Sequence, residues 1–213
     1  MTVEISKNGE AAAFFAMGVS YVRLAKNYLG YLQQQGGFGQ TRANGPLEFD
    51  TAAEVAAPLL FCTLHGVELV LKAWHLHVGR PVEPTHKISE LITAFRDNCK
   101  EPSWCDFHIA LMQLERAIKE LSGPLSGKSA ELLKVPGEPK PWSLLIIDAW
   151  YPTLRYPTFK SGQAKKYNNN HVTLTDVFAF SYASEDQWIQ LDNAVGALWK
   201  TLPSLYNDIA SGN

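Results

Sequence analysis

Four polar side chains form a narrow strip along an otherwise apolar stretch in the middle of the chain. They are His65, Glu68, Lys72 and His75, separated by steps of three, four and three residues. At 100° per residue these positions share one face of a helix. Glu68 precedes Lys72 by four residues, which is the order that favours an ion pair. The strip is therefore either a helix-stabilising pair with two histidines beside it, or the wall of a pocket. In a pocket the lysine would meet a phosphate, and the glutamate would orient it or a base.

Other groups that could do chemistry have unsuitable spacing. His75 and His77 would point in nearly opposite directions from a helix, and His65 lies three turns from His75, so no metal site is expected. Three cysteines, Cys62, Cys99 and Cys105, also lack a metal-ligand spacing. We expect free thiols in a reducing compartment and no cofactor. The run GPLSGKS has one residue too few between its glycines for a phosphate-binding loop, and it follows a helical pattern.

The stretch that carries the strip, residues 54–79, is apolar nearly all round. One stripe holds large residues such as Leu64 and Trp74, and another holds the small residues Cys62, Gly66 and Ala73, where a second helix could approach closely. Such a helix belongs in the middle of a bundle. Charged residues at its centre argue against a membrane span, and the N-terminus does not resemble a signal peptide. We expect a cytoplasmic protein that does not enter the membrane.

Further helices are expected on both sides of this one. Residues 9–35 form a first helix on which apolar residues recur at steps of three and four: Phe14, Met17, Tyr21, Leu24, Tyr28 and Leu32. The central helix is capped at Asp50 or Thr51, but Pro58 moves the expected start of its regular part toward Ala56. Gly79 is expected to end it.

Three more helices are predicted by capping patterns. Thr85 can cap a third helix, Ser103 with Asp106 resembles a capping box for a fourth, and Ser184 with Gln187 forms one for the last, where Pro203 ends or kinks the helix. The stretches PWSLLIIDAW and VTLTDVFAF are ambiguous between helix and strand. The sum is a mainly α protein, a single domain over residues 1–213. We expect an antiparallel up-and-down bundle of about five helices, with flexible loops near 33–48, 123–141 and 160–171.

A family resemblance follows from these residues. The run VELVLKAWHLHVGRPVEPTHKISELI resembles the core signature of HEPN domains, nucleotide-binding helical domains of higher eukaryotes and prokaryotes. The matching positions are Glu68, Lys72, Gly79, His86 and Leu91, and LRYP at 154–157 resembles the Arg-Tyr-Pro element of many members. The resemblance spans roughly residues 9–205 and implies an antiparallel bundle, often a homodimer. It also implies partnership with a nucleotide, RNA or a nucleotidyltransferase.

Three functions stay open. The first is a non-catalytic module that binds a nucleotide, RNA or a partner protein, with a cleft formed by Glu68, Lys72, His86, Arg155 and Tyr156. The second, also implied by the resemblance, is a metal-independent ribonuclease that uses Arg80 and His86, although two prolines separate them. The third is a structural or protein-interaction bundle without a ligand. A formal net charge of −2 indicates no global basic field for nucleic acid.

Overall fold

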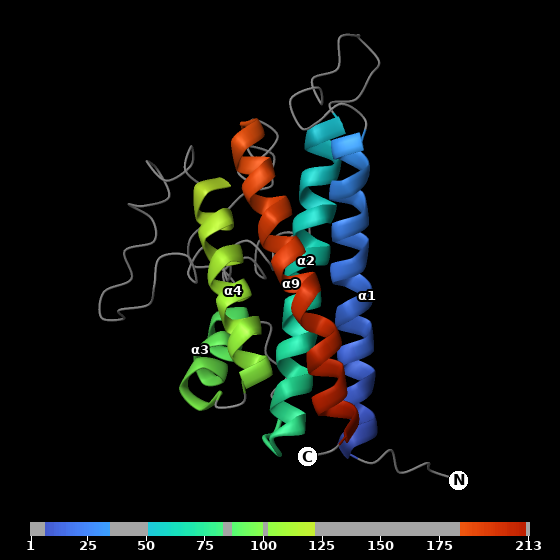
Figure 1. Ribbon diagram of the computed structural model, residues 1–213, viewed down its shortest axis with the longest axis vertical. Coiled ribbons are helices and arrows are strands. Elements are labelled where there is room, and N and C mark those ends of the chain that lie inside the picture. Colours follow the sequence, from blue (N-terminus) through green and yellow to red (C-terminus); the bar gives the residue numbers. More distant parts are fainter. Residues whose placement is uncertain (1–6, 35–50, 83–86, 100–101, 122–183, 212–213) are drawn as a thin grey trace, which may run out of the picture.

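The computed structural model describes residues 7–34, 51–82, 87–99, 102–121 and 184–211. These residues form five helices: α1 (Lys7–Gln34), α2 (Thr51–His77), α3 (Ile88–Asn98), α4 (Pro102–Leu121) and α9 (Glu185–Ser211). Helices α1 and α4 run in one direction, and α2 and α9 run in the other (Figure 1). The described part of the chain is an antiparallel up-and-down bundle, which confirms the predicted fold class.

Several predictions concern other parts of the chain. Apart from Gln33 and Gln34 at the end of α1, the predicted loops near 33–48, 123–141 and 160–171 lie outside the described residues. So do the two ambiguous stretches, PWSLLIIDAW and VTLTDVFAF.

Helix α2 is the central helix of the bundle, as its sequence predicts. It packs against α1, α3 and α9, and the large apolar stripe from Leu60 to Trp74 is buried. Its segment Pro58–His77 is the one described stretch long and apolar enough to cross a membrane, and 78% of its most apolar window is buried inside the protein. The apolar surface of α2 is thus covered by neighbouring helices, as in the core helix of a helical bundle.

Helices α1 and α2 approach each other closely at two glycines. A Cβ atom added to Gly66 would lie 2.7 Å from Val22 Cγ2 and 2.9 Å from the carbonyl oxygen of Gly18. One added to Gly18 would lie 2.8 Å from Val70 Cγ2 and 2.9 Å from the carbonyl oxygen of Gly66. Because these gaps are too short for a methyl group, the contact needs glycine on both helices. The predicted small-residue stripe is confirmed at Gly66.

The buried face of α1 differs from the stripe that its sequence suggests. Met17 and Leu24 are exposed, whereas the buried positions lie one residue away on the helix, at Phe15, Val22 and Ala25. Both sets recur at steps of three and four, so periodicity alone cannot choose between them. The glycine contact decides the choice, because it turns the side of α1 that carries Gly18 toward α2.

The ends of α2 are partly as predicted. The helix begins at Thr51 and continues through Pro58, so the expected start near Ala56 is wrong. At the other end Gly79 has a φ of 74°, and the amides of Gly79 and Arg80 donate to the carbonyls of Leu76 and His75. This pattern is a Schellman motif, in which glycine accommodates the left-handed residue that ends the helix.

Of the caps predicted for the other three helices, only the cap of α9 is confirmed. Helix α3 has Lys87 at its N-cap, without a capping side chain, instead of Thr85. Helix α4 begins at Pro102, so Ser103 lies inside the first turn, and its hydroxyl donates to Asp208 of α9 rather than forming a capping box. The last capping box is confirmed, since the amide of Ser184 donates to Gln187 Oε1 at 2.8 Å and the amide of Gln187 donates to Ser184 Oγ at 3.4 Å. Helix α9 then continues through Pro203.

Two further contacts join the helices. Lys26 Nζ of α1 donates to Asp192 Oδ1 of α9 at 2.8 Å, in a partly buried ion pair. An aromatic cluster joins α2, α3 and α4: the ring of Phe95 lies 5.1 Å from Trp74 and 5.9 Å from Trp104, with edge-to-face geometry in both pairs. The cluster holds the short helix α3 against two longer ones.

The glycine contact can be tested by adding a single methyl group at Gly66. We expect Gly66→Ala to lower the free energy of unfolding by about 1–3 kcal/mol, because Val22 and the α1 backbone must move to admit the new Cβ. Denaturant titration followed by circular dichroism would measure the change.

Gly30 of α1 is the matched control, since a Cβ there would meet nothing within 4 Å. Gly30→Ala should raise the free energy of unfolding by about 0.5–1 kcal/mol through helix propensity alone. Equal effects at both positions would contradict the close contact.

Candidate functional site

Three ionisable side chains of the polar strip on α2 form a group in which Glu68 and Lys72 are buried and His65 is partly buried. Lys72 Nζ donates to Glu68 Oε1 at 2.7 Å, and Glu68 Oε2 lies 3.2 Å from His65 Nδ1. Glu68 is 1% exposed and Lys72 is 7% exposed. The expectation of an ion pair is therefore confirmed, but the pair lies in the interior. An exposed pair of this kind would be worth only about 0.2–0.5 kcal/mol.

Two aromatic rings fix the orientation of His65. The ring of Phe61, one turn earlier on α2, stacks on it with centroids 5.2 Å apart and planes 15° apart. The ring of Tyr21 on α1 meets it edge-on at 4.6 Å. The imidazole thus has little rotational freedom, and its Nδ1 is held toward the Glu68 carboxylate.

Burial of the charged groups at this site has a free-energy cost. Removing an ion pair from water costs free energy that the attraction between the ions repays only when the remaining hydrogen-bonding groups are satisfied. Lys72 has three N–H donors, and within the described part of the chain it donates to Glu68. The ammonium therefore keeps donor capacity in a setting where an anionic acceptor would be bound more strongly than in water.

His75, the last member of the strip, lies apart from the other three. Burial lowers its pKa, the positive charge of Arg80 lowers it further, and a backbone hydrogen bond with Leu91 acts in the opposite direction. Its Nε2 is buried and has no hydrogen-bond partner among the described residues. His75 is therefore a neutral residue of the α2–α3 contact, beside the ring of Trp74.

Arg80, assigned to catalysis in the alternative reading, is held by neighbouring residues. Its Nη2 donates to Asn98 Oδ1 at 2.5 Å, and its guanidinium carbon lies 6.0 Å from the centroid of the Trp74 ring. These contacts tie the turn after α2 to the end of α3. The other predicted site residues, His86, Arg155 and Tyr156, lie outside the described residues.

A second polar cluster between α3 and α4 is absent from the sequence-based prediction. Arg96 Nη2 lies 2.7 and 2.8 Å from the two carboxylate oxygens of Glu115, and Arg96 Nε donates to His108 Nε2 at 3.0 Å. The accepting Nε2 carries no proton, so neutral His108 carries its proton on Nδ1. The only sequence signal was Glu115 beside the apolar face of α4, next to Leu111 and Leu114.

The pKa values in this cluster follow from burial and from the arginine. Burial raises the pKa of Glu115, although the hydrogen bond and the charge of Arg96 act in the opposite direction. Burial lowers the pKa of His108, and the charge of Arg96 lowers it further. The cluster acts chiefly as a structural contact that aligns α3 on α4.

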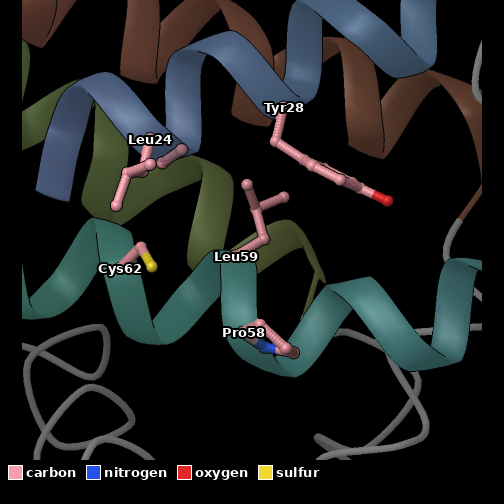
Figure 2. Close-up of a pocket in the computed structure, with 6 residues that line it drawn as sticks. Leu24, Tyr28, Pro58, Leu59 and Cys62 are labelled. Carbon is pink, nitrogen blue, oxygen red and sulfur yellow. The ribbon is translucent and has the colours of Figure 1, made fainter.

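An apolar pocket of about 200 Å³ lies between α1 and α2. Figure 2 shows Leu24 and Tyr28 above it and Pro58, Leu59 and Cys62 below it. Burial raises the pKa of the Cys62 thiol, which keeps it protonated and makes it a poor nucleophile. The described residues contain no cluster of three or more side chains that could hold a metal ion.

Comparisons of the chain with protein-family models, curated proteins and solved structures found no match. The chemistry of the buried strip itself therefore has to support any assignment of function.

The buried pair can be tested by breaking it and by replacing it. We expect Glu68→Gln to lower the free energy of unfolding by about 3–5 kcal/mol, because it leaves the Lys72 ammonium buried without a counter-charge. The double variant Glu68→Leu, Lys72→Met should recover most of that loss, since no charge remains. Denaturant unfolding of the three proteins gives the comparison.

The exposed pair of Lys87 and Glu90 on α3, 2.6 Å apart, is a matched control. Glu90→Gln should cost less than about 1 kcal/mol. If Glu68→Gln cost no more than Glu90→Gln, the pair would not be buried as described.

The cluster on α3 and α4 predicts a pH dependence. The native pKa of His108 lies below its ordinary value of 6.5, so the unfolded chain binds more protons as the pH falls through that value. Its contribution to stability is therefore complete above about pH 6.5 and is lost on acidification, with a slope of at most about 1.4 kcal/mol per pH unit. Thermal melting across this range should show less acid destabilisation for His108→Gln than for the unmodified protein.

Glu115 contributes in the opposite direction, because its raised pKa favours the native state as the pH falls through it. The His108→Gln variant retains Glu115 and its contact with Arg96, so the difference between the two proteins isolates the histidine. Identical pH slopes would show that His108 does not resist protonation in the native state.

Proposed function

We propose that this protein is a non-catalytic helical module that binds a phosphate-bearing ligand, a nucleotide or a segment of RNA, at the polar strip of α2. The observation that carries the proposal is the buried Lys72 ammonium, which donates to Glu68 at 2.7 Å and keeps donor capacity for an anion. Glu68 orients the ammonium, and His65 orients Glu68 from the other side. A buried ion pair of this kind is weak evidence for a contribution to stability, which is consistent with a role in binding.

The resemblance to HEPN domains supplies the remaining residues of the proposed site. Arg155 would bind phosphate through two parallel hydrogen bonds, Tyr156 would stack on a base, and His86 would make one hydrogen bond. The same resemblance supports a homodimer and a nucleotidyltransferase partner as parts of the proposal. A cytoplasmic location fits Cys62, Cys99 and Cys105, none of which forms a disulfide within the described part of the chain.

Binding is favoured over catalysis by the state of the candidate catalytic groups. Arg80, which the ribonuclease reading requires at a scissile phosphate, donates to Asn98 and lies over Trp74. The thiol of Cys62 is kept protonated by burial, which raises its pKa. The Glu68 carboxylate could serve as a base, but its negative charge is paired with the Lys72 ammonium. These contacts suit residues that position a ligand rather than residues that transfer protons.

Ligand titration tests the proposal. The purified protein should bind a nucleotide or short RNA from a panel without degrading it. Lys72→Met should weaken that binding by about 1.5–3 kcal/mol, or roughly 10-fold to 150-fold, because a charge-assisted hydrogen bond to phosphate is lost. Isothermal titration calorimetry would measure the affinity, with a thermal melt of each variant to confirm folding.

Two controls separate the site from general electrostatics. Lys200→Met removes an exposed lysine from α9 and should leave affinity unchanged, as should Arg80→Ala. RNA cleavage without added metal that disappears in His86→Ala would instead support the ribonuclease alternative. Neither binding nor cleavage across the panel would favour the structural bundle without a ligand.

A further inference from the structure

Helix α3 meets a histidine on each of the two helices that it contacts. His75 of α2 is buried and has a backbone hydrogen bond with Leu91 of α3. His108 of α4 accepts a hydrogen bond from Arg96 Nε of α3 at 3.0 Å. Both histidines therefore take part in contacts that α3 keeps while it is docked on the bundle.

The contact between α3 and α4 needs His108 in its neutral form. A protonated imidazole carries N–H donors on both nitrogens and has no acceptor left. Protonation of Nε2 would thus remove the bond to Arg96 and would place two positively charged groups 3.0 Å apart. The carboxylate of Glu115 already binds Nη2 of the same arginine at 2.7 and 2.8 Å.

The contact between α2 and α3 needs a neutral histidine for a related reason. Nε2 of His75 is buried and has no hydrogen-bond partner among the described residues. A proton on this atom would add a donor and a positive charge at a place where no described group accepts the bond. The charged group that acts on His75 is Arg80, a second cation, and no carboxylate of the described residues offsets it.

The pKa values of the two histidines agree with this geometry. Burial lowers the pKa of His75 and of His108, and the charge of the neighbouring arginine lowers each further. Once α3 has left, each histidine regains its ordinary value of 6.5, so the released state binds protons more readily. Docking is therefore most favourable above about pH 6.5 and is weakened on acidification. Glu115 acts against this change, because its raised pKa favours the docked state as the pH falls.

Other charged side chains on the neighbouring helices are directed elsewhere. On α3, Glu90 and Asp97 are exposed, and Glu90 pairs with Lys87. The remaining charged residues of α4 are exposed as well. On α9, Asp208 accepts a hydrogen bond from Ser103 in the first turn of α4. Within the described part of the chain, the balance is set by the two arginines and by the glutamate named above.

Helix α3 can leave without separating the other helices. It is the shortest of the five, with 11 residues, and it lies at the outer edge of the bundle (Figure 1). It packs mainly on α2, whereas α1 packs on α2 and α9, and α4 packs on α9. The four longer helices thus keep their contacts with one another when α3 is released, as expected of a unit that opens locally.

We propose that α3 is a pH-sensitive element, docked on α2 and α4 while His75 and His108 are neutral and released when they are protonated. The four longer helices stay packed in the released state. Release uncovers the parts of the Trp74 and Trp104 rings that Phe95 covers. The proposal does not depend on a ligand at the polar strip, since it rests on the contacts of α3 alone.

Native-state hydrogen exchange of the full chain, followed by NMR, tests the proposal. After correction for intrinsic exchange rates, the protection of α3 amides should fall at least about 10-fold between about pH 7.5 and about pH 5.5. The reason is that each proton taken up on release changes the opening equilibrium by up to about 10-fold per pH unit. Amides of α1 and α9 should change by less than about 3-fold, because their contacts contain neither histidine.

Histidine variants identify the groups that titrate. In the double variant His75→Gln, His108→Gln the protection of α3 should become nearly independent of pH, since glutamine is polar but does not take up a proton in this range. His77→Gln is the matched control, because His77 lies two residues from His75 and points to the opposite side of α2. This variant should retain the fall seen in the unmodified protein.

Three results would overturn the proposal. The first is an α3 whose protection does not depend on pH in the unmodified protein. The second is an unchanged fall in the double variant, with its fold at neutral pH verified by circular dichroism. The third is an equal loss of protection in α1, α3 and α9, which would show that acid unfolds the whole bundle rather than releasing α3.

Discussion

The arrangement of the bundle depends on the close contact between Gly18 of α1 and Gly66 of α2. With no side chain at either position, the two backbones approach to a distance at which a Cβ would lie 2.9 Å from the opposing carbonyl oxygen. This contact sets the rotation of α1 about its own axis. One consequence is that Tyr21 is turned toward His65 and restrains its imidazole. Another is that Met17 and Leu24 are left on the outer surface.

The effect of the buried strip of α2 on stability differs from its proposed role in ligand binding. Apolar residues of similar size in place of Glu68 and Lys72 would fill the same volume without desolvating two charges. The polar pair is therefore poorly explained by stability alone, which is why it is the basis of the proposed ligand site. By contrast, Arg96 joins His108 and Glu115 by hydrogen bonds within their own cluster, and the position of this cluster between α3 and α4 accounts for it as a packing contact.

Helix α1 carries two apolar rows, and only one of them is used inside the described bundle. The inner row packs against α2 and α9, and the outer row includes the exposed residues Met17, Leu24 and Tyr31. A helix with an apolar surface this wide would ordinarily lie in the interior of an assembly.

The sequence by itself determined the kind of fold and the position of the polar strip. Apolar periodicity identified α1 and α2 as helices, a capping box located the start of α9, and Gly79 marked the end of α2, because these signals depend on local geometry. It also placed His65, Glu68 and Lys72 on one face. Only the tertiary structure decided which row of α1 is buried, that the Glu68–Lys72 pair is in the interior, and that Arg80 contacts Asn98 and Trp74. These properties depend on contacts between residues far apart in the chain, such as Gly18 with Gly66 and Arg96 with Glu115, and helical periodicity contains no information about which helices meet or how they are rotated.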